Sequence, residues 1–183
     1  MSVICVRDFD LEKLNRTSKH KNKVGGEAVY FTYDKSKKII LQTDKLYTSF
    51  GISENNVIEV DLSDSSTLEL LKQLEDNLRK EYDTDDLKLR SILNENNLKL
   101  KVHSGENLKT VIYSSNKNEL DAIDNDVNLQ CLIQFVGIWF KNGEYGVSLR
   151  LLQIKTYEKE EHLDGYSFID DDSELPDVVP DDF

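Results

Sequence analysis

Hydrophobic and polar residues alternate over several short stretches of the chain, a pattern typical of β-strands. Residues 27–33 and 39–43 are rich in aromatic and β-branched side chains and flank a polar turn at residues 34–38, so we expect them to form a hairpin. Residues 57–62 predict another strand. Residues 98–102 and 109–113 predict a second pair of strands, joined by residues 103–107.

One helix is indicated between these groups of strands. Leucines recur with the i, i+3, i+4 spacing of one helical face, at Leu68, Leu71, Leu74 and Leu78. The serine- and threonine-rich residues 63–67 offer N-cap side chains. The helix is therefore expected to run from Thr67 to near Tyr82, and residues 87–94 suggest a second short helix. The predicted fold class is α+β and β-rich, with one or two helices.

The last part of the chain predicts a long hairpin. Asn142-Gly143 separates two β-rich runs, residues 127–140 and 145–157. Asn-Gly favours a two-residue hairpin turn because both central residues of that turn need positive φ. The expected opposed pairs are Phe140 with Tyr145, Trp139 with Gly146, Gly137 with Ser148, Phe135 with Arg150 and Ile133 with Leu152.

The two faces of this predicted hairpin differ in chemistry. Directly opposed residues share a face, so one face collects apolar side chains and belongs against the core: Phe140, Tyr145, Ile138, Val147, Val136, Leu149 and Leu151. The other face carries Trp139 and Phe135 among small residues, with Arg150 adjacent. Such a face suits the stacking of unpaired bases together with a phosphate contact. Packing of the same two rings beneath a covering helix is an equally weighted alternative.

Charge divides the chain into two parts. The 183 residues contain 35 acidic and 23 basic side chains, a net charge of −12. Residues 158–183 hold 11 of the acids and one base, whereas residues 1–50 hold ten bases and six acids. We therefore expect a folded domain over residues 1–157 and a largely disordered acidic tail over residues 158–183.

Basic and aromatic residues are interleaved in the first third of the chain. Residues 13–23 contain five bases and no acid, and residues 19–26 are expected to form a basic loop. A groove that holds a nucleic-acid strand needs this mixture of cations and rings, although core packing is the alternative for each single ring. With the hairpin residues, the candidate nucleic-acid-binding set is Lys19, Lys21, Lys23, Tyr30, Tyr33, Lys35, Lys37, Lys38, Phe135, Trp139 and Arg150.

Nothing in the sequence favours an enzyme or a cofactor. It contains none of the nucleotide-binding, zinc-protease or serine-hydrolase motifs. The three histidines lack metal-ligand spacing, and Cys5 and Cys131 are expected to be reduced, packed thiols. No membrane span or signal peptide is expected, which predicts an intracellular protein. The histidine and cysteine spacing predicts that the protein binds no metal.

The end of the tail resembles a known motif. Residues 169–183 are acidic, contain two prolines and finish on phenylalanine. Bacterial and phage single-stranded DNA-binding proteins similarly end in an acidic tip that closes on phenylalanine. In that family the tip docks replication proteins and competes with DNA for the basic groove. The resemblance implies these roles for Asp177, Pro180, Asp181, Asp182 and Phe183.

A second resemblance covers most of residues 28–157. The chain has, in this order, residues 41–52, a strand ending at Leu62, a helix, and residues 136–155. This order is similar to that in small proteins of nucleocytoplasmic large DNA viruses. These are regarded as OB-fold-like single-stranded DNA-binding proteins. The resemblance implies an OB-fold-like Greek-key barrel or a curved antiparallel sheet, at work in the host cytoplasm or nucleus where the virus replicates.

The function expected from sequence is thus sequence-independent binding of single-stranded DNA for replication or repair. RNA is the alternative ligand, and a homo-oligomer is left open. The competing hypothesis is a non-enzymatic interaction or structural viral protein, in which the acidic tail is the ligand for another protein.

Overall fold

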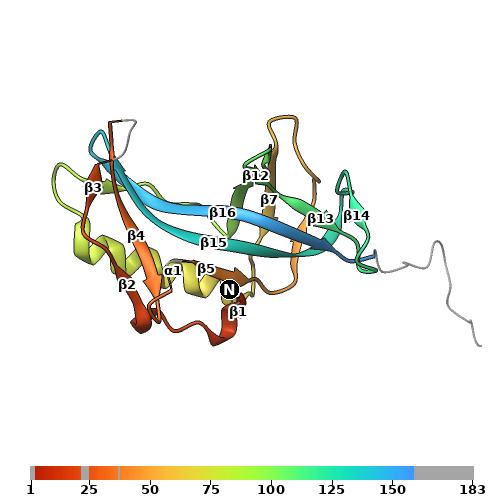
Figure 1. The fold of residues 1–183 in the computed structure, drawn as a ribbon, viewed down its shortest axis with the longest axis horizontal. Coiled ribbons are helices and arrows are strands. Elements are labelled where there is room, and N and C mark those ends of the chain that lie inside the picture. The colour runs from red at the N-terminus through yellow and green to blue at the C-terminus, as the bar shows by residue number, and fades with distance from the viewer. Residues whose placement is uncertain (1–2, 22–24, 37, 159–183) are drawn as a thin grey trace, which may run out of the picture.

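The centre of the fold is one long antiparallel hairpin, β15 (Val127–Lys141) and β16 (Glu144–Thr156) (Figure 1). The computed structural model describes residues 3–21, 25–36 and 38–158. Along the free edge of β15, three strands pair one after another: β4 (Glu27–Tyr33), β5 (Ile39–Gln42) and β6 (Leu46–Thr48). The acidic tail predicted from residue 158 lies, except for Glu158, outside the described residues.

The remaining strands extend this sheet. Two short strands run parallel to β16, namely β8 (Lys88–Leu89) and β13 (Val111–Tyr113), and β14 (Glu119–Leu120) pairs with β13. Beyond β6 follow β7 (Val57–Asp61), β10 (Asn97–Lys101) and β9 (Leu93–Asn94). At the other side, β1 (Val3–Cys5) pairs with β5, while β2 (Leu14–Arg16) and β3 (His20–Lys21) pair with β4. A separate two-stranded ladder joins β11 (Ser104–Gly105) to β12 (Leu108–Lys109), and the 3-10 turns η1 (Val6–Asp8) and η2 (Leu11–Lys13) follow β1.

The path of the main sheet is open, but its two sides approach each other. β10 contacts β16, and Thr110 lies between them with its hydroxyl donating to the carbonyl oxygen of Leu151 at 2.9 Å. The sheet therefore bends back toward itself around a core that includes Ile58, Leu98, Leu100, Leu129 and Ile154. The expected β-rich α+β class is confirmed at this level.

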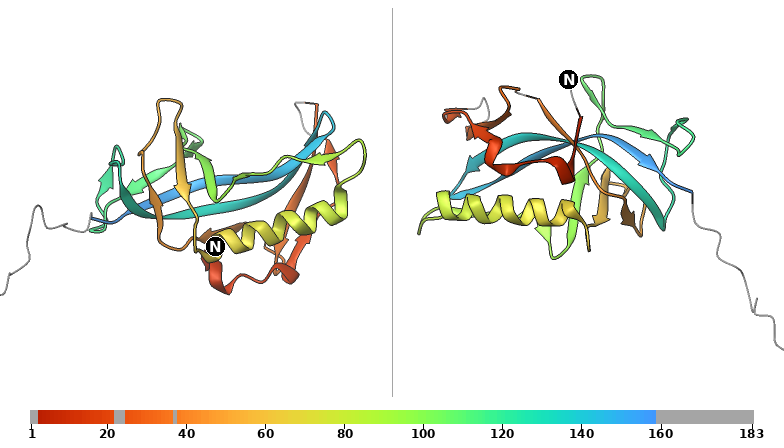
Figure 2. Two further views of the ribbon diagram at one scale, coloured as in Figure 1. Left: turned by 180° about the vertical axis from the view of Figure 1, so that it is seen from behind. Right: turned by 90° about the horizontal axis from the view of Figure 1, so that it is seen from below.

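Helix α1 (Ser66–Tyr82) covers one side of the hairpin, while β12 and the loop before β7 rise on the opposite side (Figures 1 and 2). The helix begins one residue before the predicted Thr67 and ends at Tyr82 as predicted. The Ser65 side chain caps it by accepting from the Leu68 amide at 3.1 Å. The buried Asp44 carboxylate also accepts from the Thr67 amide at 3.1 Å, a favourable place for a negative charge.

The other end of α1 is fastened to the hairpin by Tyr145. Its fully buried hydroxyl lies 2.6 Å from a carboxylate oxygen of Asp83 and 3.0 Å from the carbonyl oxygen of Leu78. Burial, followed by the hydrogen bond to Asp83, raises the pKa of Tyr145 well above its ordinary value. The hydroxyl is therefore neutral and available as a donor at any ordinary pH.

The two cysteines behave as expected. Both are free thiols, Cys131 fully buried and Cys5 partly so. Burial raises the pKa of Cys131 to about 12, because the apolar surroundings disfavour the thiolate. Neither cysteine is paired in a disulfide.

Three local predictions are wrong. Residues 27–33 and 39–43 do not form a hairpin with each other, because β4 and β5 both pair with β15. Residues 98–102 and 109–113 likewise find other partners, β7 for the first and β16 for the second. Residues 87–94 form β8 and β9 rather than a second helix. The long hairpin accounts for four of these strands, because β4 and β5 pair with β15 while β8 and β13 pair with β16. β9 and β10 instead pair with each other, and β10 also pairs with β7.

The tip of the terminal hairpin is as predicted. Asn142 and Gly143 have φ values of 53° and 76°, as a two-residue turn of this kind requires. The observed pairs include Phe140 with Tyr145, Trp139 with Gly146 and Gly137 with Ser148.

Below Gly137 the predicted register is wrong by one residue. A β-bulge inserts Val136 as an extra residue in β15, so Phe135 pairs with Leu149 and Gln134 pairs with Arg150. An extra residue turns the following side chain to the opposite face of the sheet. Phe135 consequently points into the core, where it is 3% exposed. A second irregularity leaves Ile133 opposite Leu151 instead of Leu152.

We predict that Glu75 is a main support of the segment between α1 and β10. This carboxylate is 2% exposed and accepts from the Ile92 amide and the Ser91 hydroxyl, both at 2.8 Å. Glu75→Ala leaves those donors without their partner, so the free energy of unfolding should fall by about 2 kcal/mol in urea denaturation.

Asp76→Ala is the matched control. Glu75 and Asp76 both pair with Arg79, but the side chain of Asp76 is 61% exposed. It should cost less than about 0.5 kcal/mol. Equal losses in the two variants would contradict the role given to Glu75.

Candidate nucleic-acid interface

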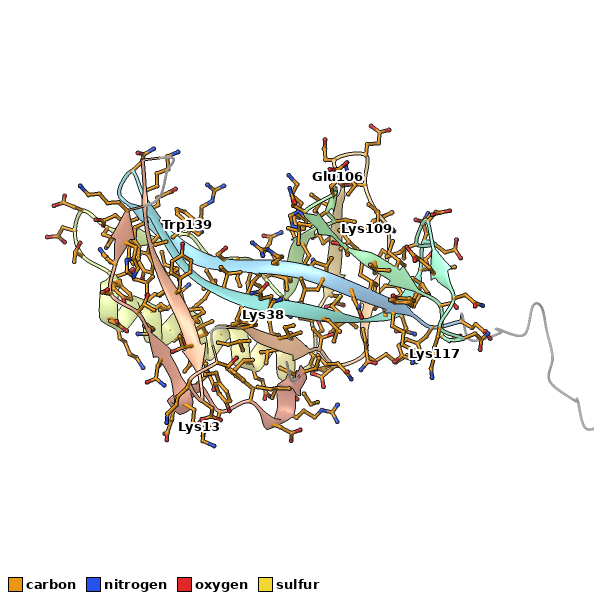
Figure 3. The ribbon with its side chains drawn as sticks, viewed as in Figure 1. Lys13, Lys38, Glu106, Lys109, Lys117 and Trp139 are labelled. Atoms are coloured by element: carbon orange, nitrogen blue, oxygen red, sulfur yellow. The ribbon has the colours of Figure 1, made fainter. Side chains whose placement is uncertain are left out.

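The side of the hairpin away from α1 carries a row of residues contributed by four strands. Trp139 of β15 pairs with Gly146 of β16 and with Ala28 of β4, and Ala28 in turn pairs with His20 of β3. Directly paired residues share one face of a sheet. Figure 3 shows Trp139 on the side of the hairpin opposite α1. We call this surface the outer face and define it by His20, Tyr30, Arg90, Trp139, Ser148 and Arg150.

The indole of Trp139 is held against a glycine. A Cβ atom built on Gly146 would lie 2.8 Å from Cζ2 of the indole, a distance that real Cβ contacts do not reach. Gly146 is buried and Trp139 is half-buried, so the ring covers the glycine and keeps part of its own surface in solvent. The ring is thus both fixed and accessible, as a stacking platform requires.

Tyr30 lies in the next row of the outer face, paired with Gly137. Its side chain is 46% exposed, and its ring centroid lies 6.2 Å from that of His20. A Cβ on Gly137 would come within 2.0 Å of the Val29 carbonyl oxygen, so the glycine is what lets β4 approach β15 here.

Two arginines lie on the β16 side of these rings. The Arg90 amide donates to the Tyr145 carbonyl oxygen at 2.7 Å, which places Arg90 beside Gly146, and its side chain is 71% exposed. Its guanidinium is 3.9 Å from the carboxylate of Glu144, a loose contact that leaves it free to bind other anions. Arg150 is exposed two residues beyond Ser148 on β16.

Further positive charge gathers beyond Arg150. The pKa of His103 is lowered, first by burial and then by the charges of Lys101 and Arg150. His103, which follows β10, is therefore near both Lys101 and Arg150, at the place where β10 contacts β16. Its lowered pKa favours the neutral imidazole, so the positive charge here belongs to Lys101 and Arg150.

Two of the predicted aromatic residues are core residues instead. Tyr33 is 8% exposed and stacks on Phe9 with ring centroids 4.7 Å apart. Phe135 also packs near Phe9, at 6.1 Å, because the bulge at Val136 turns it inward. Tyr30 and Trp139 are the members of the predicted aromatic set that are accessible.

The predicted lysines of residues 19–21 lie on the other side of the sheet from Trp139. Side chains alternate along a strand, so Lys19 and Lys21 face away from the side on which His20 lies. The ammonium group of Lys19 sits 4.1 Å from the ring centroid of Phe140 and 3.6 Å from the Glu27 carboxylate. These two lysines therefore border the core face.

The predicted lysines of the following turn are also remote from Trp139. Lys35 and Lys38 follow the end of β4 that is distant from Ala28, the partner of Trp139. In Figure 3, Lys38 lies below the hairpin, whereas Trp139 lies above it. Lys23, Lys37 and the tail residues Asp177, Pro180, Asp181, Asp182 and Phe183 lie outside the described residues.

Two residues of the outer face, His20 and Arg90, were not predicted, and neither was the neighbouring Lys101. His20 could have been found from its alternation with Lys19 and Lys21. The position of Arg90 depends on the parallel pairing of β8 with β16, which joins residues more than 50 positions apart and leaves no local signal. The same is true of Lys101, because β10 reaches β16 only through the bend of the sheet.

Comparison with known protein families, curated proteins and solved structures found no match to this chain. Among the described residues, no helix has both the length and the apolar character to cross a membrane. In the same part of the chain, no three His, Cys, Asp or Glu side chains are grouped so as to hold a metal ion.

We predict that Gly146→Ala displaces the indole of Trp139, because the added Cβ overlaps the ring. Trp139 is the chain's single tryptophan, so intrinsic fluorescence reports on it alone. Its emission should move to longer wavelength and its quenching by acrylamide should increase. Gly105→Ala is the control, since its Cβ would meet nothing closer than 3.8 Å. Unchanged emission in Gly146→Ala would contradict the packing described.

Proposed function

We propose that the outer face binds single-stranded DNA without regard to its sequence. The observation that carries the proposal is the fixed, partly exposed indole of Trp139, with the exposed ring of Tyr30 in the adjacent row and with Arg90 and Arg150 on the β16 side of the indole. Bases of any identity stack on such rings, and phosphates pair with the arginines. RNA presents the same groups and is the alternative ligand.

The arrangement suits a single strand better than a duplex. In a duplex the faces of the bases are stacked on one another and unavailable to Trp139 and Tyr30. An unpaired strand can turn its bases onto the rings and leave its backbone toward the arginines. From Gly146 to Arg150 the outer face extends about 13 Å along β16, at roughly 3.3 Å per residue.

Several features support an OB-fold-like assignment and a role in replication or repair as part of this proposal. A five-stranded, partly open barrel uses one exposed sheet face to bind oligonucleotides. Here the sheet also bends around its core, and the bend brings β10 to β16. Sequence-tolerant binding is what proteins that protect transiently exposed strands need.

The acidic tail would compete with DNA in this proposal. Residues 158–183 carry a net charge of −10, while the outer face contains Arg90 and Arg150 and has Lys101 nearby. A covalently attached polyanion has a high effective concentration at such a surface. When DNA occupies the face, the tail would be released to dock replication proteins.

We predict that labelled oligo-dT binds the protein at low salt, that added salt weakens the binding, and that a duplex of equal length competes poorly. Trp139→Ala should weaken binding roughly 5- to 150-fold, since stacking on one base is worth about 1–3 kcal/mol. Fluorescence anisotropy measures each affinity, and the unfolding midpoint shows that the variant is folded.

Phe50→Ala is the matched control, because Phe50 is 80% exposed and is not part of the outer face. Its affinity should equal that of the wild type. Absence of binding in the wild-type protein and in the tail-less protein alike would refute the proposed function.

We also predict that deletion of residues 164–183 tightens binding to oligo-dT at low salt, because it removes the competing negative charge. The gain should shrink as salt is added, since screening weakens the tail and the DNA alike. A tail with its acids replaced by Asn and Gln separates charge from length. Equal or weaker affinity after the deletion would rule out competition by the tail.

A further inference from the structure

A cavity of about 350 Å³ lies on the same face of β15 as Trp139, farther along the hairpin. By alternation, and allowing for the bulge at Val136, the residues of β15 on this face below Gly137 are Gln134, which is buried, followed by the half-buried Leu132 and Gln130. The last two of these line the cavity. Leu132 is seven residues from Trp139, or roughly 23 Å along the strand.

The cavity combines an apolar floor with uncommitted amides. Leu132 lies in its centre, paired with Gln42 of β5 on one side and with Gln153 of β16 on the other. Within the described residues, no hydrogen bond engages the side-chain amide of Gln42 or of Gln153. A glutamine amide offers two donors and an acceptor, so this row presents a flat apolar surface edged by hydrogen-bonding groups.

The remaining walls suit a nucleotide. Gln130 is held rigid, since its amide nitrogen donates to the Thr43 carbonyl oxygen at 3.2 Å and its oxygen accepts from the Tyr157 hydroxyl. Tyr113 adds an aromatic wall, and Lys117 and Lys155 are exposed at the rim, where a phosphate would sit. A volume near 350 Å³ lies at the small end of the range for small-molecule sites, which fits one nucleotide rather than a longer segment.

We propose that this cavity receives one unpaired nucleobase of the bound strand and contacts its edge through Gln42 and Gln153. The inference rests on the proposed function and goes beyond it. Binding along the outer face is sequence-tolerant, whereas the nucleotide in the cavity is read by hydrogen bonds. The strand then runs in one direction, from Trp139 past Arg150 to the cavity, and one of its ends has a defined position.

The first test moves a single abasic site along a labelled oligonucleotide and measures affinity by anisotropy. Removal of the base that enters the cavity should weaken wild-type binding about tenfold, and this position should lie toward one end of the bound segment. In the double variant Gln42→Leu/Gln153→Leu the same abasic site should have a smaller effect. The matched control Gln73→Leu, an exposed glutamine on α1, should behave as wild type.

Two results of this test would overturn the proposal. One is an abasic profile with no sensitive position near either end, although Trp139→Ala still weakens binding. The other is a sensitive position that is unaltered in a double variant whose unfolding midpoint matches that of Gln73→Leu.

The second test does not depend on strand binding, so it separates failure of this proposal from failure of the proposed function. The four deoxynucleoside 5′-monophosphates are titrated into isotope-labelled protein while the side-chain amide resonances of Gln42 and Gln153 are followed. These resonances should shift with the nucleotides and not with deoxyribose 5-phosphate, which lacks the base. Equal shifts with deoxyribose 5-phosphate, or none with any nucleotide, would overturn the base-binding role even if oligo-dT binds the outer face.

Discussion

The register of the β15–β16 hairpin is the constraint on which the rest of the structure depends. The Asn142-Gly143 turn determines which side chains of these two strands face α1 and which face away. β4, β5 and β6 pair with β15, and β8 and β13 pair with β16, so all five take their positions from this register. A slip of one residue would exchange the two faces of the hairpin and place Trp139 in the core. The outer face is therefore a consequence of one turn.

The bulge at Val136 lets β15 place Trp139 on the outer face and Phe135 in the core. Toward the turn, alternation places Phe140 against the core and Trp139 on the outer face. Beyond the bulge the alternation is reversed, so Phe135 enters the core beside Phe9. Gly137 adjoins the bulge and leaves room for the β4 backbone at Val29 and Tyr30. Gly146 leaves room for the indole of Trp139.

The sequence was sufficient for features set by neighbouring residues. The leucine spacing and Ser65 define α1, and Asn142-Gly143 defines the tip of the hairpin. Strand pairing was not predictable in the same way, because β4 and β5 have a local turn between them and still pair with β15, about a hundred residues away. One feature of the sequence indicated a bulge, namely a glycine inside a predicted strand. Composition did not show where the extra residue lies relative to Phe135.

The candidate site was predicted in part for the same reason. Trp139, Tyr30 and Arg150 could be selected from strand chemistry, whereas Arg90 reaches the outer face, and Lys101 its neighbourhood, through long-range contacts. The lysines that dominate the first third of the chain proved a poor guide. Those at residues 19, 21, 35 and 38 lie away from Trp139. Lysines that are close together in the sequence therefore do not gather around Trp139 on one surface.

The central claim is that bases stack on Trp139. Titration of the protein's intrinsic tryptophan fluorescence with unlabelled oligo-dT at low salt tests it most directly, since Trp139 is the one tryptophan in the chain. The account predicts saturable quenching that added sodium chloride reverses and that an equal-length duplex produces only weakly. Oligonucleotide binding, seen by anisotropy, that leaves the emission of Trp139 unchanged would contradict it.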